Sequence, residues 1–559
     1  LQLVTTVTDG DTDSFQTLET QTLISGDNSF ISFDDDGPQV SVAANATFSL
    51  NHDETLFAQQ PDDVSSISVA LQLAALFSTV ANPGDDQHVP LSFPLGFARS
   101  DFAALTIVNV DFGTDGGAVS GSQVYSLTLK GEGEEEGEEG SATNGPVASG
   151  LQTTELRDIY LFVEGDFVVG RYDTAGGIPD GSDPAAFAIA INASTGIVSL
   201  VQYVSLYHPD DTDRDDTVLL DDIAGSLSAT LTVTDGDGDQ ASASTDIGAS
   251  ISFDDDGPLV AAVRNRDFRL TVDESPDAQP GTDDVMGSLD VFDMIEFKGD
   301  DPHIAGSAPL AFATEAGNNP LVFLPFFGVD GPAASDSLVY SLVLSAPGAL
   351  PALQTTEGST IRPYAATDGT NDWIVGRVDD PASLADGDAA FAVTIDPVSG
   401  SVSLVQYLSL KHPNTADSND EITLASGLIS ARVTLTDGDG DTASSEAGIS
   451  NRIVFRDDGP TLVDQKFELA TVDEDGLDTD PPATSSLSDS NADAMRPGEV
   501  TGTNSNVDVT GSLSALVNFG VDGPGANGGF GLKTEMSPVD SYFNSKGMDF
   551  FFVFDGSSL

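Results

Sequence analysis

Two stretches with the sequence Thr-Asp-Gly-Asp-Gly-Asp each carry three aspartates that alternate with glycine. The aspartates are Asp235, Asp237 and Asp239 in the first stretch and Asp437, Asp439 and Asp441 in the second. In an extended chain this alternation places the three carboxylates on one side, and the glycines allow the backbone to curl round an ion. Ca²⁺ takes six to eight oxygen ligands from carboxylates and carbonyls. We therefore predict Ca²⁺ ligands here; the alternative is an Asp-Gly hairpin turn without metal.

Two further acidic clusters recur along the chain. One ends an apolar run and precedes Gly-Pro, and it consists of Asp34–Asp36, then Asp254, Asp255 and Asp256, then Asp457 and Asp458. The other opens each repeat, as Asp53 and Glu54, Asp273 and Glu274, and Asp473 and Glu474. Gly-Pro ends the strand and stiffens its exit. If this linker lies between two domains, the clusters are expected to share ions that fix the angle between the domains. The alternative is that the acids only keep the surface soluble.

Other kinds of site find little support. An EF-hand needs glycine at position six of its loop, where this chain has Gln240 or Thr442. Of five histidines only His208 and His412 recur, each before proline and after a matched strand, and we interpret them as structural. No nucleophile elbow, phosphate loop or zinc motif is present. The sequence therefore predicts a protein that is not an enzyme.

The composition restricts the classes of partner. The net charge is −72, from 91 acidic and 19 basic residues, and phosphates would be repelled, so nucleic acid is not an expected partner. The chain has no cysteine, which excludes thiolate sites and leaves a hard cation as the obvious staple. Its 39% hydrophobic residues fall in alternating runs typical of folded domains. The longest apolar run, 67–80, is too short for a membrane span.

The spacing of these motifs defines repeats. The Gly-Pro linkers end at Pro38, Pro258 and Pro460, which gives periods of 220 and 202 residues. We predict four segments: the C-terminal tail of a truncated repeat at 1–37, full β repeats at 38–257 and 258–459, and the N-terminal part of a truncated repeat at 460–559. The first full repeat carries an acidic loop insertion at 131–140. Because the chain starts and stops inside repeats, we expect a fragment of a longer protein.

The segments between the acidic motifs are typical of β-strands. Residues 124–129, 187–191, 197–203 and 227–233 are short, rich in β-branched side chains and separated by Gly, Pro, Asn and Asp turns. Regularly spaced strands without amphipathic helices predict an all-β fold of tandem immunoglobulin-like β-sandwich repeats in an elongated array. Whether each repeat holds one sandwich or two is left open.

Taken together, these strings resemble the large repeat domain of type I-secreted bacterial giant proteins, in the repeats-in-toxin adhesin group. That family ends each unit with Thr-Asp-Gly-Asp-Gly-Asp and a strand closing on Asp-Asp-Gly-Pro, and the match extends over essentially all 559 residues. The resemblance implies a secreted, extracellular protein at the cell surface of a Gram-negative bacterium. It further implies adhesion or biofilm formation for the whole protein, with these repeats as its stalk. The nonapeptide Gly-Gly-x-Gly-x-Asp repeats of that group are absent from this chain.

The expected function is therefore that of a calcium-stabilised extender. Its expected partners are calcium ions, neighbouring repeats of the same chain and, through other domains, host or surface glycans. The alternative is a repeat module that itself binds glycan or polymer. This alternative predicts exposed aromatic side chains at matched loop positions, where the chain offers Trp373 and Phe167.

Overall fold

The structure is a computed structural model. It describes residues 2–3, 6–8, 10–16, 21–22, 34–55, 60–89, 94–130, 142–220, 227–275, 281–304, 309–315, 317–345, 353–369, 371–379, 387–463, 517–525, 539–545 and 548–552. The acidic insertion at 131–140 and the predicted ligands Asp473 and Glu474 lie outside the described residues.

The chain divides into two compact units. The first comprises Leu1–Leu259, Pro325–Ser337 and Leu435–Ala443, and the second comprises Val260–Leu324, Leu338–Thr434 and Ser444–Leu559. The first unit thus includes two short segments, at 325–337 and 435–443, that the sequence period assigns to the second repeat. The repeat boundaries themselves stay a prediction.

The first unit consists mainly of strands. Its elements are β1 (Gln2–Leu3), β2 (Thr6–Thr8), β3 (Ser14–Gln16), β4 (Gln21–Thr22), β5 (Gln39–Ala44), β6 (Leu50–Asp53), α1 (Ile67–Phe77), β7 (Gly96–Ala103), β8 (Leu105–Asp111), β9 (Gln123–Lys130), β10 (Ala142–Thr143), β11 (Val147–Gln152), β12 (Asp158–Glu164), β13 (Phe167–Tyr172), β14 (Ala185–Ile191), β15 (Ile197–Gln202), β16 (Thr217–Leu219), β17 (Leu227–Thr234), β18 (Gln240–Asp246), the 3₁₀ turn η1 (Gly248–Ser250) and β19 (Ile251–Asp254).

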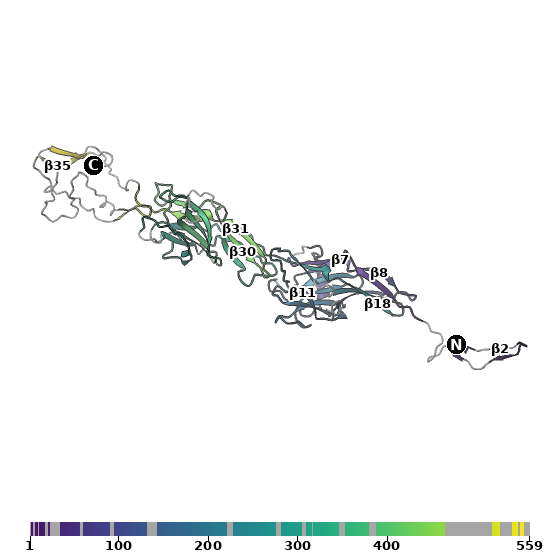
Figure 1. The fold of residues 1–559 in the computed structure, drawn as a ribbon. Coiled ribbons are helices and arrows are strands. Elements are labelled where there is room, and N and C mark those ends of the chain that lie inside the picture. Colours follow the sequence, from purple (N-terminus) through teal and green to yellow (C-terminus); the bar gives the residue numbers. More distant parts are fainter. Residues whose placement is uncertain are drawn as a thin grey trace. The chain divides into compact units, whose positions relative to one another are not determined.

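Two antiparallel sheets enclose the core of the first unit. One has six strands in the order β11-β12-β13-β14-β15-β7, and its edge strands β11 and β7 are labelled in Figure 1. The other has four strands in the order β10-β9-β17-β18. Leu161 and Phe187 of the first sheet belong to the same buried cluster as Leu129 and Leu231 of the second, as expected for a sandwich.

The other face of the six-stranded sheet is also covered. Leu73 and Phe77 of α1 pack with Val169 and Val201 in a second buried cluster. Burial on both faces explains why β14, Ala-Ala-Phe-Ala-Ile-Ala-Ile, is continuously apolar instead of alternating. The segment 67–77 has no Gly or Pro, and Leu73 and Phe77 are four residues apart, so both face the sheet from one side of a helix. Our expectation of strands without helices was wrong at this segment.

The second unit repeats the plan with fewer strands. Its elements are β20 (Val263–Arg264), β21 (Leu270–Asp273), the 3₁₀ turn η2 (Asp290–Phe292), β22 (Ala311–Glu315), β23 (Leu321–Val322), β24 (Leu338–Leu344), β25 (Ile361–Thr367), β26 (Asp372–Val378), β27 (Ala389–Ile395), β28 (Val402–Gln406), β29 (Glu421–Thr423), β30 (Ile429–Thr436), β31 (Thr442–Gly448), the 3₁₀ turn η3 (Ser450–Arg452), β32 (Ile453–Arg456), β33 (Thr461–Leu462), β34 (Val517–Asn518), β35 (Val539–Ser545) and β36 (Met548–Phe552).

Its main sheets correspond to those of the first unit. Five strands run in the order β22-β28-β27-β26-β25, and three run in the order β24-β30-β31. Where the first unit uses α1, the second covers its larger sheet with the segment around η2, whose Phe292 and Ile295 pack on Trp373 and Tyr407. The predicted all-β class is confirmed. No helix in the described part of the chain is long and apolar enough to span a membrane.

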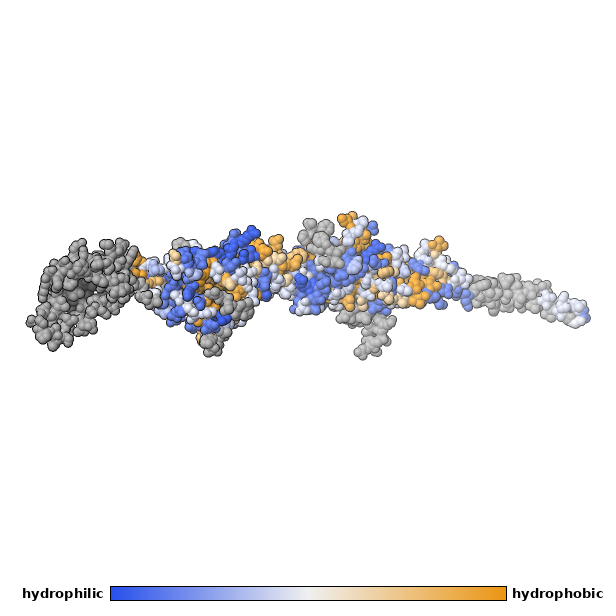
Figure 2. Space-filling model, turned by 90° about the horizontal axis from the view of Figure 1, so that it is seen from above, coloured by the Kyte–Doolittle hydropathy of each residue, from blue (hydrophilic) through white to orange (hydrophobic). Residues whose placement is uncertain are grey.

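The surface is mostly hydrophilic. Figure 2 shows small hydrophobic groups distributed among hydrophilic residues on the face in view. Exposed apolar side chains include Ile67 and Leu71 of α1 and Val119 and Val398 in loops. Ile67 and Leu71 lie four residues apart and therefore on one side of α1, whereas Val119 and Val398 stand alone.

A small parallel pairing brings two of the predicted acidic clusters together. Strand β6 pairs in parallel with β19, with Leu50 opposite Ile251 and Asp53 opposite Asp254. In the second unit β21 pairs in parallel with β32 in the same register, with Leu270 opposite Ile453. Because paired parallel strands end at the same edge, the acids that follow β6 and β19 emerge side by side.

Close packing within the larger sheet gives a stability prediction. A Cβ on Gly376 of β26 would lie 2.2 Å from the ring of Phe391, and one on Gly170 of β13 would lie 2.5 Å from the ring of Phe187. Gly376→Ala is therefore expected to destabilise the second unit by about 1–3 kcal/mol, measured by urea unfolding. Gly448→Ala is the control because a Cβ there has no atom within 4 Å. Equal stability of the two variants would contradict the packing.

Candidate metal centres

The first unit contains a buried cluster of acids, which we call the first cage. Its members are Glu54, Asp255, Asp256, Asp330, Asp437, Asp439 and Asp441, with His208 beside them. Glu54 follows β6, and Asp255 and Asp256 follow β19. Asp330 comes from the segment 325–337, and the other three come from the turn between β30 and β31.

The Thr-Asp-Gly-Asp-Gly-Asp stretch forms that turn. The Asp437 amide donates to the Asp441 carbonyl at 3.1 Å. The Gly440 amide donates to Asp437 Oδ1 at 3.2 Å, and Gly440 has φ +122°, a conformation that favours glycine. The stretch Asp235–Asp239 closes in the same way, with its first amide 3.1 Å from its last carbonyl. The hairpin turn is therefore present, and it collects the three carboxylates.

Glu54 is one of the most deeply buried acids of the first cage, with 1% of its surface exposed. Its Oε1 accepts hydrogen bonds from the Leu206 amide at 3.0 Å and from the Gln202 side chain. Its Oε2 is buried and has no donor among the described residues. His208 Nε2 lies 3.9 Å from Glu54 Oε1. One carboxylate oxygen is thus held by the protein and the other remains available.

Asp256 and Asp330 are held by a tight loop. The Val329 amide donates to both oxygens of Asp256, at 2.9 and 3.0 Å, and Thr154 donates to Asp330 Oδ1 at 2.6 Å. Gly328 has φ +75°, and a Cβ there would lie 2.6 Å from Asp256 Oδ1. Only glycine therefore lets the loop wrap around this carboxylate.

Six buried carboxylate oxygens of the first cage have no donor in the described part of the chain: Glu54 Oε2, Asp255 Oδ2, Asp330 Oδ2, Asp437 Oδ2, Asp439 Oδ1 and Asp441 Oδ2. An unsatisfied buried charge is costly, so such groups are normally paired or bound to a cation. All six are carboxylate oxygens, the kind of ligand that Ca²⁺ takes, and Glu54, Asp256 and Asp330 offer oxygens within 4.8 Å of one another. The donor set of the first cage therefore fits calcium.

The charges of the first cage repel one another without a cation. Burial, followed by the charges of Asp330 and Asp439, raises the pKa of Asp255 to about 11. Burial and Asp330 raise the pKa of Asp256 to about 10. Burial and the neighbouring Asp439 raise the pKa of Asp437 to about 9. Each carboxyl thus resists ionisation until positive charge is supplied.

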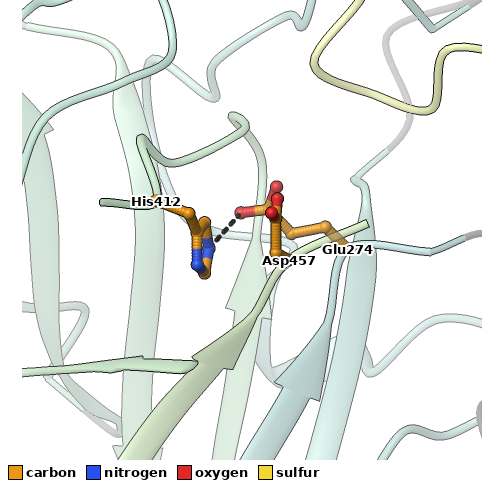
Figure 3. A group of neighbouring side chains, drawn as sticks. All are labelled: Glu274, His412 and Asp457. Atoms are coloured by element: carbon orange, nitrogen blue, oxygen red, sulfur yellow. Dashed lines mark ion pairs between the residues drawn. The ribbon is translucent and has the colours of Figure 1, made fainter. Parts of the chain in front are cut away.

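The second unit holds an equivalent cluster, the second cage, formed by Glu274, His412, Asp457, Asp458 and Asp522. Glu274 Oε1 accepts from the Leu410 amide at 2.9 Å, and Asp458 Oδ2 accepts from the Val521 amide at 2.8 Å. Asp522 Oδ1 accepts from Thr356 at 2.8 Å. Figure 3 shows His412 and Asp457 turned toward the Glu274 carboxylate, with His412 Nε2 3.9 Å from Glu274 Oε1.

The two cage histidines differ in their protonation. Burial lowers the pKa of His208, but Glu54 and Asp216 more than reverse this and raise it to about 9. Burial also lowers the pKa of His412, and Asp420 and Asp522 do not offset it, so the pKa stays below its ordinary value.

A third, exposed cluster, the outer cluster, lies in the first unit and consists of Asp35, Asp36, Asp115, Asp237 and Asp239. The Thr114 amide donates to Asp36 Oδ2 at 2.8 Å, as Val329 does to Asp256. A Cβ on Gly113 would lie 2.7 Å from the Asp36 carbonyl, which repeats the tight loop of the first cage. The outer cluster is thus the same arrangement of linker, loop and turn.

Most of the predicted ligands lie in these three groups. Asp254 and Asp273 do not, because protein donors engage them. Asp254 accepts from Asn51 at 2.8 Å and from Thr217 at 2.7 Å. Asp273 Oδ1 accepts from the Ser275 amide at 2.9 Å. Asp235 is buried and its Oδ1 accepts from the Asp239 amide at 2.8 Å, although its Oδ2 has no donor in the described residues.

The sequence-based interpretation missed several members. Asp115, Asp330 and Asp522 each lie in a recurring Phe-Gly-x-Asp-Gly string that we used only to define repeats. The signal was an aspartate that recurs in each repeat at the same distance from the same two glycines. His208 and His412 were interpreted as structural, and the structure places both in the cages. His88 and His303 also occupy matched positions, packed against Gly331 and Gly523, although their sequences differ.

Comparison with known proteins places the chain in a family. A search of curated protein sequences found no significant match. Among solved structures, the extracellular cadherin domains 1–4 of protocadherin gamma B7 gave 9% identity over 53% of this chain and 71% of that chain, with a TM-score of 0.09. A similarity this weak supports no argument about fold or function. One family matches the chain twice, over residues 49–248 and 269–450, which together are more than half of its length, so the chain belongs to the family described as Domain of unknown function (DUF5801).

Proposed function

We propose that these repeats are a calcium-stabilised stalk in a secreted bacterial adhesin. The six donorless carboxylate oxygens of the first cage are the observation that carries the proposal. The resemblance to repeats of type I-secreted adhesins supports the location, at the cell surface of a Gram-negative bacterium, and the role in adhesion or biofilm formation. The segment acts mechanically and is not an enzyme.

The first cage would hold Ca²⁺ through Glu54, Asp256 and Asp330, whose donor atoms lie within 4.8 Å of one another, and through the acids of the 437–441 turn. Bound calcium supplies the positive charge that the buried carboxylates lack. Asp330 and the turn belong to segments 325–337 and 435–443, which lie in the first unit while their flanking strands lie in the second. Calcium in the first cage would therefore hold these two connections in place.

Calcium concentration would determine where the stalk is rigid. Extracellular modules bind Ca²⁺ with dissociation constants of roughly 10⁻⁴–10⁻³ M. Outside the cell the cages would fill, and in the cytoplasm they would stay empty. An empty, self-repelling chain with net charge −72 is suited to export before folding.

The alternative, a glycan-binding module, loses its main sequence argument. Trp373 is buried, and its indole nitrogen donates to the Val291 carbonyl at 3.0 Å. Phe167 is partly buried, and its ring lies 5.6 Å from the ring of Phe77. Trp373 is therefore not presented for stacking on a sugar, and the matched aromatic pair is lost.

Thermal unfolding of the whole chain with Ca²⁺ and with Mg²⁺ tests the proposal. At a hundredfold excess over its dissociation constant, one bound ion adds roughly 2.7 kcal/mol to the free energy of unfolding. For units of this size that is roughly 5–10 °C for each filled site. Mg²⁺ should give much less, since it prefers small octahedral sites with several waters. Equal melting temperatures in Ca²⁺, Mg²⁺ and chelator would refute the proposal.

A further inference from the structure

Each cage contains one nitrogen donor among its oxygens. The His208 side chain is 1% exposed and the His412 side chain 3% exposed. The Nε2 atoms of both imidazoles are buried and have no hydrogen-bond partner within the described residues. Each Nε2 faces a glutamate: Glu54, which follows β6, in the first cage and Glu274, which follows β21, in the second. At equivalent positions of the two cages, each buried Nε2 thus lies 3.9 Å from a glutamate oxygen without a hydrogen bond.

The other ring nitrogen lies beside an aspartate in each cage. His208 Nδ1 lies 3.1 Å from Asp216 Oδ1 and 3.2 Å from the Asp216 carbonyl, and His412 Nδ1 lies 3.4 Å from Asp420 Oδ1. Histidines that bind metals through one nitrogen commonly donate the N–H of the other to a carboxylate or carbonyl, which orients the ring. Asp216 has this position in the first cage, whereas His412 Nδ1 has no hydrogen-bond partner within the described residues.

The imidazole and the glutamate lie close to each other without a hydrogen bond. The 3.9 Å from Nε2 to Oε1 in each cage is too long for a hydrogen bond. Two donors that each lie about 2.1 Å from one tetrahedral ion are about 3.4 Å apart, so a shared ion draws the nitrogen and the carboxylate together.

The second cage divides into two overlapping sets of donors. Glu274, Asp457, Asp458 and Asp522 offer oxygen only, and Glu274, His412 and Asp457 offer two carboxylates and one nitrogen. Oxygen donors suit Ca²⁺, whereas imidazole suits Zn²⁺ and similar divalent transition metals. In the first cage Glu54, Asp256 and Asp330 form the oxygen set, and His208 Nε2 lies 3.9 Å from Glu54 Oε1.

We propose that each cage has a second, nitrogen-containing compartment that binds a divalent transition metal of the Zn²⁺ class beside calcium. Glu54 with His208, and Glu274 and Asp457 with His412, provide its ligands, and the glutamate carboxylate is shared with the calcium compartment. This inference rests on the proposed calcium cages and adds a second class of metal to them.

The chain supplies its own matched control. His88 and His303 recur in the two repeats and lie 3.7 Å and 3.6 Å from Asp86 and Asp301. Their side chains are 46% and 33% exposed, and neither belongs to a cage. Replacing this pair removes as many histidines as replacing the cage pair and removes none of the proposed ligands, although both rings pack against the glycines that follow Asp330 and Asp522.

Zinc calorimetry and zinc-edge X-ray absorption on the whole chain, in excess Ca²⁺, test the proposal. The wild-type chain is expected to bind two Zn²⁺ ions with imidazole nitrogen among their ligands. The double variant His208→Gln/His412→Gln should lose both, and His88→Gln/His303→Gln should keep both. The wild-type absorption spectrum remains decisive if the cage variant does not fold.

Three results would overturn the second compartment. These are a spectrum with oxygen ligands only, zinc binding that survives loss of His208 and His412, and displacement of one calcium by each zinc. The calcium-induced melting shift is recorded in the same samples. If that shift persists, only this inference fails; if it is absent as well, the calcium proposal fails with it.

Discussion

Replacing Asp330 by asparagine is expected to stabilise the metal-free protein and to weaken its response to calcium. Asp330 is 3% exposed, and burial together with the charge of Glu54 raises its pKa well above the ordinary value. Its Oδ2 has no donor among the described residues. An amide in its place carries no charge at any pH and can donate to a neighbouring carboxylate, so the folded chain no longer has to hold a proton at this position. Relieving one unsatisfied buried group is worth about 1–3 kcal/mol.

The same substitution removes one charged ligand from calcium. The calcium affinity of the first cage should fall by at least about tenfold, which is 1.4 kcal/mol of binding free energy. The order of the two melting temperatures should therefore reverse: the variant melts at a higher temperature than the wild type in chelator and at a lower temperature in calcium. A purely structural aspartate would lower the melting temperature under both conditions.

Two further variants make the result specific. Asp522→Asn alters the second cage at the equivalent position, so it should affect the second unit in the same way. Asp166→Asn removes an exposed acid in the turn between β12 and β13 and should change neither condition appreciably. An equal effect of Asp166→Asn would mean that general charge repulsion, and not the cage, controls stability.

The repeat pattern of the sequence pointed to many of the acids that the structure brings together, and their role as metal ligands stays a prediction. Recurrence of the triple aspartates and of the Asp-Asp-Gly-Pro linkers indicated places where charge must be balanced. Alternating runs bounded by turn residues indicated strands, because period two is visible within a single segment. The all-β class followed from these local signals.

The composition of each cage could not be predicted in this way. Glu54 approaches Asp255 only because β6 pairs in parallel with β19, about 200 residues later in the chain. Parallel pairing between distant segments leaves no local signal in either strand. Asp330 likewise joins the cage through a loop whose glycine wraps around Asp256. The helix α1 was missed because an apolar run of eleven residues is compatible with a buried strand or a buried helix.

The metal-free protein is expected to become less stable as the pH rises from about 4.5 to about 8, the reverse of ordinary acid unfolding. Burial raises the pKa of Asp255, Asp256 and Asp437 to about 11, 10 and 9, whereas the unfolded value is 3.8. Between these limits the folded chain binds more protons than the unfolded chain. Stability is therefore complete below the unfolded pKa and is lost as the pH rises toward the folded values, by about 1.4 kcal/mol per pH unit for each extra proton.

Acids whose pKa is lowered in the folded protein do not offset this fall in the free energy of unfolding between about pH 4.5 and pH 8. Glu421, paired with Arg269 and Arg456, and Asp396, bonded to the Ser399 amide, contribute stability that is lost only as the pH falls through their lowered values. That loss takes place at or below the ordinary pKa of a carboxyl group, which lies below the interval from about pH 4.5 to pH 8. Ca²⁺ binds ionised carboxylates, so its stabilising effect should be greatest near pH 8 and should shrink toward pH 4.5, where protons occupy the same oxygens.

Urea unfolding across this pH range, with chelator and with Ca²⁺, measures both effects. In chelator the free energy of unfolding should fall with rising pH, and in Ca²⁺ it should be flat or rise. Asp330→Asn should reduce the slope in chelator, because the charge that raises the pKa of Asp255 and Asp256 is gone. Stability that increases with pH in chelator would mean that the cages hold ionised carboxylates without a cation. That result would refute the proposal that the cages require calcium.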